Sequence, residues 1–404
     1  MKVAFLSREY PPDSAWGGIA TAYHTLACAL AERGHEVHVI CQAAGVPRDS
    51  IDEGVFVHRV GTNPKRYSAM ARIDYSTHAL FKLRDIIRKH GIEIVEATYW
   101  GAEAFFYSLR KRTPLVVRMD ISASDILKTG GYSGVREMLN LKLLSRLEDF
   151  SARRADRVVA ISKDFYDYAT DKLHINSKRV DLVHHAVDIE RFRFVESDIR
   201  ERLGIPSNAP LVLFVGRLES RKGVHILCRA FADIVRNMPG TRFVLVGSDT
   251  DTAPAGGSMK SYINEQAGSN GFRDNLVFID FLPQEELPGL YSTCDLVVSP
   301  SLHESFGLVV LEAMACGKPV VVTSTGIVPE LRLNGEGVIV VEPGDAAGLA
   351  EATIKMLSLD EKDRKRIAGE NREVVKSGFS VPAWVDKVIG VYEEALSKRR
   401  SSQV

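Results

Sequence analysis

The sequence lacks the features of membrane-spanning, secreted and metal-cluster proteins. No apolar stretch approaches the roughly 18–20 residues that a helix needs to cross a bilayer. The first residues, MKVAFLSREYPP, contain a short apolar run that ends at Arg8 and Glu9, which indicates a first strand rather than a signal peptide. The cysteines have apolar neighbours and no Cys-x-x-Cys spacing, so we expect reduced, buried thiols in a cytoplasmic protein. They are Cys28, Cys41, Cys228, Cys294 and Cys316.

An excess of charge is also absent, because 52 Lys and Arg residues are balanced by 52 Asp and Glu residues. A dedicated nucleic-acid-binding protein would show a basic excess, so that class of function is disfavoured. The Gly-x-Gly-x-x-Gly turn of dinucleotide-binding proteins is missing from VGRLESRKG, and the first loop, with WGG, lacks a third glycine. A dinucleotide oxidoreductase is therefore a poor fit.

What the chain does contain is a regular alternation of short apolar runs and helical patterns over 404 residues. This length favours two domains. Continuous apolar runs indicate strands buried on both faces, and interleaved helices indicate parallel sheets. We therefore predict an α/β protein of two facing, doubly wound, Rossmann-like domains. The predicted strands lie at 3–7, 36–41, 92–97, 114–120, 157–162, 180–185, 209–216, 241–247, 275–280, 295–300, 318–324 and 337–342.

The division between the domains is expected in the charged and turn-rich segment that precedes residue 209. We predict an N-terminal domain at 1–190, a C-terminal domain at 191–378, and a last helix at 379–404 that packs back toward the N-terminal domain. Open α/β sheets bind ligands outside the carboxyl ends of their strands. Two such domains predict an interdomain cleft suited to a two-substrate reaction.

A basic loop, GRLESRKG, follows the first strand of the second half. Gly216 ends the strand, Arg217 and Lys222 lie in the loop, and Gly223 opens the next helix. Strand, glycine, basic residues and helix N-terminus together indicate an anion site. The alternative is a solvated loop with surface cations, and the motif alone leaves both open.

Two glutamates bracket an apolar run in SLHESFGLVVLEAMAC. Glu304 follows a predicted strand, and Glu312 lies within a helix that we expect to be buried, from Leu308 to Cys316. A buried carboxylate needs a hydrogen-bond partner, either inside the protein or on a ligand with hydroxyl groups. The glutamates are eight positions apart, which corresponds to about 12 Å along a helix. This distance is too long for the two carboxylates to share a proton, but it suits contacts with the two ends of one long ligand.

Together these motifs resemble a known family. GRLESRKG and SLHESFGLVVLEAMACGKPVVVTSTGIVPEL, supported by PPDSAWGGIA, VVAISKDF and VHHAVDIERF, are similar to the retaining, two-domain glycosyltransferases of family 4, or group 1. This family includes sucrose-phosphate synthase and bacterial mannosyltransferases, and it has the GT-B fold. The resemblance covers most of the chain, and the combination of the basic loop with both glutamates is specific.

The resemblance implies roles for the residues around the donor phosphates. Arg217 and Lys222 would bind the diphosphate and stabilise the charge on the leaving group. Gly17 and Gly18 would approach the donor phosphate from the first domain. The backbone amides that would face the phosphates belong to Phe306, Gly307 and Leu308.

It also implies a mechanism. Glu312 would bind the ribose hydroxyls, and Glu304 would contact the donor sugar, so that the catalytic residues are Arg217, Lys222 and Glu304. The sugar would be transferred with retention, with the leaving phosphate as acceptor of the proton, and without a metal or cofactor. The donor would be a UDP-, GDP- or ADP-linked sugar.

Three sequence features depart from the family or point elsewhere. Asp120 stands where the family often has a histidine, and either contact with a sugar hydroxyl or capping of the next segment is open to it. In HHAVD, many relatives have Asn-Gly directly before the Val-Asp. Adjacent strand residues such as His184 and His185 point to opposite faces, so they rarely share a metal, and His185 is expected to be structural or to line the cleft. Asp249-x-Asp251 resembles a manganese motif of another fold, but turn chemistry explains it adequately.

The acceptor side is less defined. Tyr10, Trp16, Tyr99 and Trp100 lie near predicted strand ends or loops, where aromatic rings either stack on sugars or pack the core. The helix VREMLNLKLLSRLEDFSARR places basic residues beside leucines. It either touches an anionic membrane or is an ordinary amphipathic helix.

We therefore predict a cytoplasmic, metal-independent glycosyltransferase of polysaccharide biosynthesis, with peripheral contact at the inner membrane face as an option. Its acceptor would be a glycan, a lipid-linked sugar or a small-molecule hydroxyl. The alternatives are a non-catalytic sugar-nucleotide-binding protein, which would hold a donor without turnover, and a nucleotide-sugar epimerase, which would need an acid–base pair around the sugar.

Overall fold

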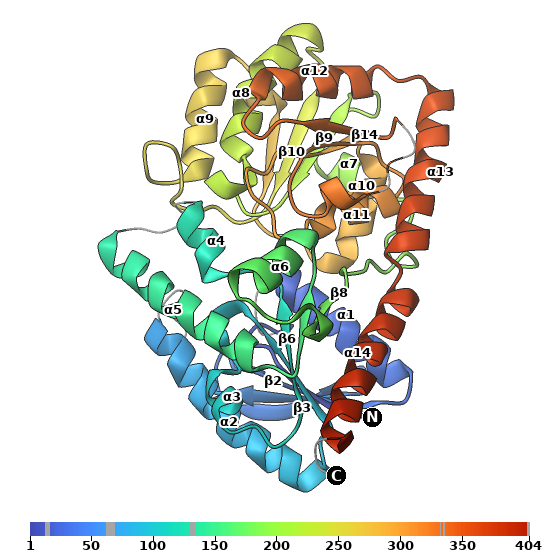
Figure 1. Ribbon diagram of the computed structural model, residues 1–404. Helices are drawn as coiled ribbons and strands as arrows, with labels where there is room; N and C mark the ends of the chain where they lie inside the picture. Colours follow the sequence, from blue (N-terminus) through green and yellow to red (C-terminus); the bar gives the residue numbers. More distant parts are fainter. Residues whose placement is uncertain (13–16, 62–68, 130–133, 332, 334–335, 402–404) are drawn as a thin grey trace. The chain divides into compact units, whose positions relative to one another are not determined.

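The chain divides into two compact units, each described by itself below. The first comprises Met1–Ala186 with Val381–Val404, and the second comprises Val187–Ser380. The boundaries lie a few residues from the predicted 190 and 378, and the last helix belongs to the first unit (Figure 1). The structure, a computed structural model, describes all residues except 13–16, 62–68, 130–133, 332, 334–335 and 402–404.

The first unit is built on an eight-stranded sheet in the order β3-β4-β2-β1-β5-β6-β7-β8. All neighbouring strands are parallel except β3 and β4, which form an antiparallel hairpin that the sequence analysis missed. The strands are β1 (Lys2–Leu6), β2 (Glu36–Gln42), β3 (Arg48–Asp52), β4 (Val55–Val60), β5 (Ile94–Thr98), β6 (Leu115–Met119), β7 (Arg157–Ala160) and β8 (Val180–Leu182).

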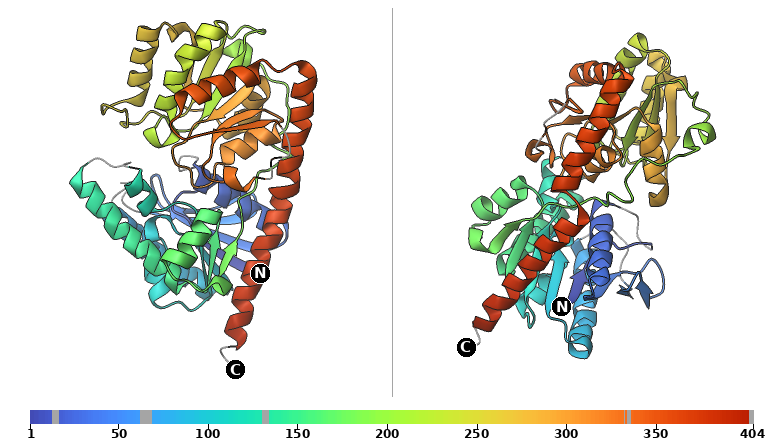
Figure 2. Two further views of the ribbon diagram at one scale, coloured as in Figure 1. Left: turned by 45° about the horizontal axis from the view of Figure 1, so that its top comes forward. Right: turned by 90° about the vertical axis from the view of Figure 1, so that its right-hand side faces the viewer.

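Helices cover both faces of this sheet (Figure 2). They are α1 (Gly18–Glu32), α2 (Ala69–His90), α3 (Phe105–Leu109), α4 (Ala123–Lys128), α5 (Val135–Arg154), α6 (Lys163–Asp167) and α14 (Val381–Ser401), with short turns η1 (Trp100–Ala102), η2 (Tyr168–Lys172) and η3 (Ser177–Arg179). Helix α14 packs against α1, and both share one core with β1 and β2. Its buried stripe is the one that helical spacing predicts: Trp384, Val388, Val391 and Ala395.

The second unit is built on a six-stranded parallel sheet in the order β11-β10-β9-β12-β13-β14. The strands are β9 (Leu211–Val215), β10 (Arg242–Val246), β11 (Leu276–Ile279), β12 (Leu296–Ser299), β13 (Val320–Thr323) and β14 (Val338–Val341). Each corresponds to a predicted apolar run. The sheet is doubly wound, as the alternation of strands and helices predicts.

Helices again flank the sheet. They are α7 (Ile199–Arg202), α8 (Val224–Asn237), α9 (Met259–Asn270), α10 (Leu287–Thr293), α11 (Leu308–Ala315), α12 (Ala346–Leu357) and α13 (Glu361–Gly378), with η4 (Ser220–Lys222), η5 (Arg273–Asn275), η6 (Gln284–Glu286) and η7 (Val328–Glu330). Helices α8, α9 and α12 share a core with Val212 and Phe214 of β9, which point to the same face. The predicted apolar face of α8 is fully buried: Val224, Leu227, Phe231 and Ile234.

Among the described residues, no helix is both long enough and apolar enough to span a membrane. All five cysteines are buried and none forms a disulfide, which agrees with the reduced thiols that the sequence predicts.

Candidate active site

The strand order of the second sheet places a ligand site at one position. Strand β9 pairs with β10 on one side and with β12 on the other, so the winding direction reverses between β9 and β12. Loops that leave the carboxyl ends of two such strands diverge to opposite faces and form a crevice. The β9–α8 loop contains Arg217 and Lys222, and the β12–α11 loop contains Glu304.

These two loops touch through a glycine. Gly223 is the N-cap of α8 and has a φ of 68°, in the left-handed region that favours glycine. A Cβ atom at this position would lie 1.9 Å from the carbonyl oxygen of Pro300, at the end of β12. No other residue allows the start of α8 to approach β12 so closely, and this approach brings the basic loop to the glutamate loop.

Lys222 and Glu304 meet directly, since the Lys222 ammonium forms an ion pair and hydrogen bond with Oε2 of Glu304. Arg221 lies 3.8 Å from the other oxygen, Oε1. Both cations stabilise the ionised carboxylate. Burial raises the pKa of Glu304, but the opposing effect of Lys222 and Arg221 is larger in sum, and the pKa falls to about 2. Glu304 is therefore an anion at neutral pH.

Arg221, which the sequence analysis did not assign to the site, holds the two loops together. Its carbonyl oxygen accepts a hydrogen bond of 2.9 Å from the amide of Leu302, and its guanidinium donates one of 3.2 Å to the carbonyl of His303. The same guanidinium lies 2.8 Å from Glu219, which also pairs with Arg217 at 3.0 Å. Arg217 is thereby positioned at the crevice, with a side chain that is one-third exposed.

Glu312 is buried within α11, as the sequence predicts, and its partner is an internal tyrosine. The hydroxyl of Tyr291, on α10, donates a hydrogen bond of 2.8 Å to Oε2 of Glu312. Burial raises the pKa of Glu312 to about 7, against the effects of the Tyr291 hydrogen bond and of Arg191. Glu312 therefore lies near its midpoint at neutral pH. The sequence analysis did not identify Tyr291 as its partner.

The start of α11 has the features of an anion site. Gly307, its N-cap, has a φ of 99° and provides no side chain to cap the helix. The first amides of a helix have no partner within the helix and carry its positive dipole end. The preceding residue, Phe306, is buried, and its carbonyl accepts a 2.7 Å hydrogen bond from Ile327. The loop is thus held in place, and the amides near Leu308 lie at a defined position.

Comparison with known proteins decides the family. Residues 16–191 match the model for glycosyltransferase family 4, and residues 195–374 match the model for glycosyl transferases group 1. The chain is a family 4, group 1 glycosyltransferase. An uncharacterized glycosyltransferase from Methanocaldococcus jannaschii is 28% identical over 408 residues, which cover 98% of this chain and 99% of that protein.

Solved structures show the same fold. Sucrose-phosphate synthase from Thermosynechococcus elongatus superposes with a TM-score of 0.81 at 23% identity, over 98% of this chain and 99% of that chain. The Anabaena protein HepE, in complex with UDP and glucose, superposes with a TM-score of 0.75 at 23% identity, over 98% and 100% of the two chains. The glycosyltransferase has the GT-B fold that the sequence predicts, with two Rossmann-like domains.

In the first domain of this glycosyltransferase, Gly17 and Gly18 lie at the start of α1. Gly17 is the N-cap, and no side chain caps the helix there. An added Cβ at Gly18 would meet no described atom within 4 Å, so the backbone is open at this point. Trp16, one of the predicted contacts, lies outside the described residues.

Asp120 is buried directly after β6, at the carboxyl end of the strand. It does not cap α4, which was one of its two predicted roles, because Ser122 accepts the hydrogen bond from Asp125 at that N-terminus. Burial raises the pKa of Asp120 to about 7, opposed by nearby backbone amides and by Arg118. Oδ2 makes no hydrogen bond of ordinary geometry among the described residues.

The remaining aromatic and histidine candidates of the first domain are buried, which favours packing over sugar stacking. The Tyr99 hydroxyl donates to Asp149, and Arg72 lies over the Trp100 ring at 4.8 Å. His185 packs edge-to-face on Trp384 at 5.7 Å. Tyr10 belongs to the core of β1 and α1.

Two groups of described residues have the spacing to hold a metal ion, and neither includes a predicted site residue. They are His24, Cys28 and Glu53, and Glu36, His38 and His90. The Asp-x-Asp motif serves its loop instead. Asp249 accepts hydrogen bonds of 2.9 Å from the Thr250 amide and 2.8 Å from the Lys260 amide, which agrees with the turn role.

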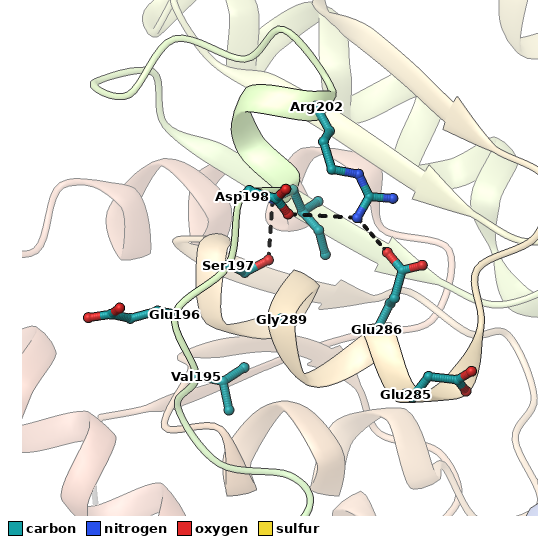
Figure 3. Close-up of a pocket in the computed structure, with 9 residues that line it drawn as sticks. Val195, Glu196, Ser197, Asp198, Arg202, Glu285, Glu286 and Gly289 are labelled. Carbon is teal, nitrogen blue, oxygen red and sulfur yellow. Dashed lines mark hydrogen bonds and ion pairs between the residues drawn. The ribbon is translucent and has the colours of Figure 1, made fainter.

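A shallow hollow of about 670 Å³ lies elsewhere in the second domain. Figure 3 shows Arg202 between Asp198 and Glu286, whereas the side chains of Glu196 and Glu285 point away from Arg202. The lining also includes Val195, Ser197, Ile199 and Gly289. None of the residues predicted to bind the donor contributes to it, and its excess of carboxylates does not suit a diphosphate.

Proposed function

We propose that this glycosyltransferase moves a sugar, with retention, from a nucleoside diphosphate sugar to a hydroxyl acceptor. The observation that carries the proposal is the meeting of Lys222 with Glu304 at the switch point of the second sheet, beside the start of the helix that carries Glu312. The cations Arg217 and Lys222 and the helix N-terminus complement the charge of a diphosphate. The carboxylates of Glu304 and Glu312 complement the hydroxyl groups of the sugars on its two sides.

The diphosphate is proposed to bind Arg217, Lys222 and the first amides of α11, around Gly307. Arg217 is suited to bidentate contact with phosphate oxygens, whereas Lys222 supplies a point charge. Negative charge grows on the leaving diphosphate as the glycosidic bond breaks, so these groups stabilise the transition state more than the ground state. Lys222 also pairs with Glu304. In the proposed complex its ammonium therefore contacts both the diphosphate and the carboxylate that lies beside the donor sugar.

The state of Glu304 limits its role. With a pKa of about 2, it is not a proton donor at neutral pH. It is instead suited to accept hydrogen bonds from sugar hydroxyls and to stabilise positive charge that develops on the sugar ring. The acceptor proton then passes to the leaving phosphate, which needs no metal or other cofactor.

Glu312 is proposed to accept hydrogen bonds from the ribose hydroxyls, which are common to UDP, GDP and ADP. That a solved relative binds UDP and glucose supports a nucleotide sugar as donor. Asp120, at the carboxyl end of β6, is proposed to contact the sugar or the acceptor, since one oxygen of its buried carboxyl lacks a hydrogen bond of ordinary geometry. Buried free cysteines support a reducing, cytoplasmic site of action.

Calorimetry with a chelator present tests the proposal. UDP, GDP, ADP and their sugar conjugates are titrated into the wild type, Glu312→Ala and a control, Glu351→Ala, whose glutamate is exposed on α12. We expect one nucleotide to bind the wild type and the control alike and to bind Glu312→Ala more weakly. Nucleotide release with an acceptor mixture, and the anomeric configuration of the product by NMR, then separate a transferase from a binding protein. No binding of any nucleotide would refute the donor site.

A further inference from the structure

Helix α5 has an outer face that the proposed reaction does not use. It lies on the outside of the first unit, beside α3 and α4 (Figure 1). Four apolar side chains on this face are exposed, by 69%, 57%, 45% and 36%. They are Val135, Leu139, Leu143 and Phe150. Spacings of 4, 4 and 7 residues place them on one stripe of the helix.

Basic side chains lie within and beside this stripe, and exposed acids are absent from it. The exposed basic residues of α5, all of whose residues are described, are Arg136, Lys142, Arg146, Arg153 and Arg154. The three acids of α5 are turned inward. Glu148 is buried and accepts hydrogen bonds from two backbone amides, Asp149 is half-buried and bonds Tyr99, and Glu137 is half-buried.

The face continues onto the end of α3. Arg154 donates hydrogen bonds to the carbonyls of Ser108 and Leu109, and Phe150 packs against Phe105 with ring centroids 5.6 Å apart. Leu109 is 47% exposed, and Arg110, directly after it, is exposed as well. We define the α5 face as the exposed residues of α5 together with Leu109 and Arg110.

We propose that the α5 face docks the protein on an anionic lipid bilayer. A helix of 20 residues that exposes apolar side chains together with cations on one face lies in the plane of a membrane interface. The apolar side chains enter the acyl region, and the long cationic side chains extend to the anionic headgroups. Lysine and arginine near an anionic surface each strengthen binding about fivefold.

Two observations favour a bilayer over a protein surface. The face is one side of a 20-residue helix, and its exposed apolar side chains run from Val135 to Phe150. A second copy of the same face would bring cation against cation, and such like-charge contact opposes association. The complement of this face is an apolar surface with anions at its edge, which is the structure of an anionic bilayer.

Vesicle flotation with the full-length protein tests the proposal without any nucleotide, so its outcome is independent of the donor site. Vesicles of phosphatidylcholine alone are compared with vesicles that also contain phosphatidylglycerol. We expect flotation with the anionic vesicles and much less with the neutral ones. Raising the salt from about 0.1 M to about 1 M, which shortens the Debye length from about 10 Å to about 3 Å, weakens the binding.

Two variants examine the two components. Reversal of three charges, Arg136→Glu, Lys142→Glu and Arg146→Glu, is expected to weaken binding about 100-fold or more. Its matched control makes the same change in net charge in the second unit. The control residues are the exposed lysines Lys355, Lys362 and Lys376.

Removal of the apolar stripe is the second variant. Leu139→Ser with Leu143→Ser is expected to weaken binding about tenfold. Phe81→Ser, which removes an exposed apolar side chain of α2, is expected to leave binding unchanged. Unchanged melting temperatures establish that the variants are folded. Lack of binding to anionic vesicles, equal loss in a variant and its control, or a dimer in solution that depends on Leu139 and Leu143 would each overturn the proposal.

Discussion

Removal of the Tyr291 hydroxyl is expected to change the pH range over which nucleotide binds. Tyr291 donates a hydrogen bond of 2.8 Å to the buried carboxyl of Glu312, whose pKa is about 7. In Tyr291→Phe the aromatic ring is retained and the donor is lost. The ionised form of Glu312 is then less stable, and its pKa rises further.

The size of the shift follows from the hydrogen bond. A bond to a charged group contributes about 1.5–3 kcal/mol, and one pKa unit corresponds to about 1.4 kcal/mol. The pKa of Glu312 therefore rises by about one to two units. If the ribose binds the carboxylate, wild-type affinity is about tenfold lower at pH 6 than at pH 8, and in Tyr291→Phe the same loss occurs about one to two pH units higher.

The assay is calorimetric titration of the preferred nucleotide at several pH values between 6 and 9. The pH dependence that comes from ionisation of the nucleotide phosphates is measured with Glu312→Gln and subtracted. That variant keeps an oxygen that can accept from Tyr291, and its affinity is expected to be independent of this ionisation. Tyr262→Phe, at a half-buried tyrosine of α9, is the matched control. A Tyr291→Phe profile that coincides with the wild type would refute the coupling of Tyr291 to Glu312.

Three further predictions concern turnover and stability. Lys222→Ala is expected to lower kcat about 100- to 1000-fold with a small change in melting temperature, and wild-type turnover in this variant would exclude a role for Lys222 in leaving-group stabilisation. Gly223→Ala is expected to cost about 3–5 kcal/mol in the free energy of unfolding, because its Cβ would lie 1.9 Å from the carbonyl oxygen of Pro300. Gly256→Ala, with a similar φ of 84° and no atom within 4 Å, is expected to cost only about 1–2 kcal/mol in the same chemical denaturation, and equal costs would refute the close approach. Because burial raises the pKa of Glu312 from 4.5 to about 7, the free energy of unfolding is expected to fall by about 3 kcal/mol as pH rises between those values. Glu312→Gln is expected to remove this pH dependence of stability in chemical denaturation, and an unchanged pH dependence would contradict the raised pKa.

Much of the fold follows from hydrophobic pattern. The helix at Val224–Asn237 was predicted because its apolar residues recur at helical spacing. The strands of the second unit were predicted from continuous apolar runs, which indicate strands that are buried on both faces. The hairpin of Arg48–Asp52 and Val55–Val60 was missed. Its first strand is polar and mostly exposed, so it shows no apolar run, and the tight turn at Glu53 and Gly54 was its main signal.

The candidate site was predictable in its residues more than in its contacts. Lys222 and Glu304 both follow strands, but their meeting depends on β9 and β12 being neighbours. Chain order does not specify which strands of a parallel sheet are adjacent. The hydrogen bond from Tyr291 to Glu312 joins residues 21 positions apart on two helices. It depends on how these helices pack together, which no local sequence pattern predicts. Similarly, Asp120 appeared able to cap α4 until the structure placed Ser122 at the cap.

We infer that the switch point of the second sheet binds a nucleoside diphosphate, and a crystal structure with the preferred nucleotide is the decisive experiment. We expect the diphosphate on Arg217, Lys222 and the first amides of α11, with the ribose hydroxyls within hydrogen-bond distance of Glu312. A nucleotide bound away from Lys222, or with its ribose directed away from Glu312, would refute this donor site.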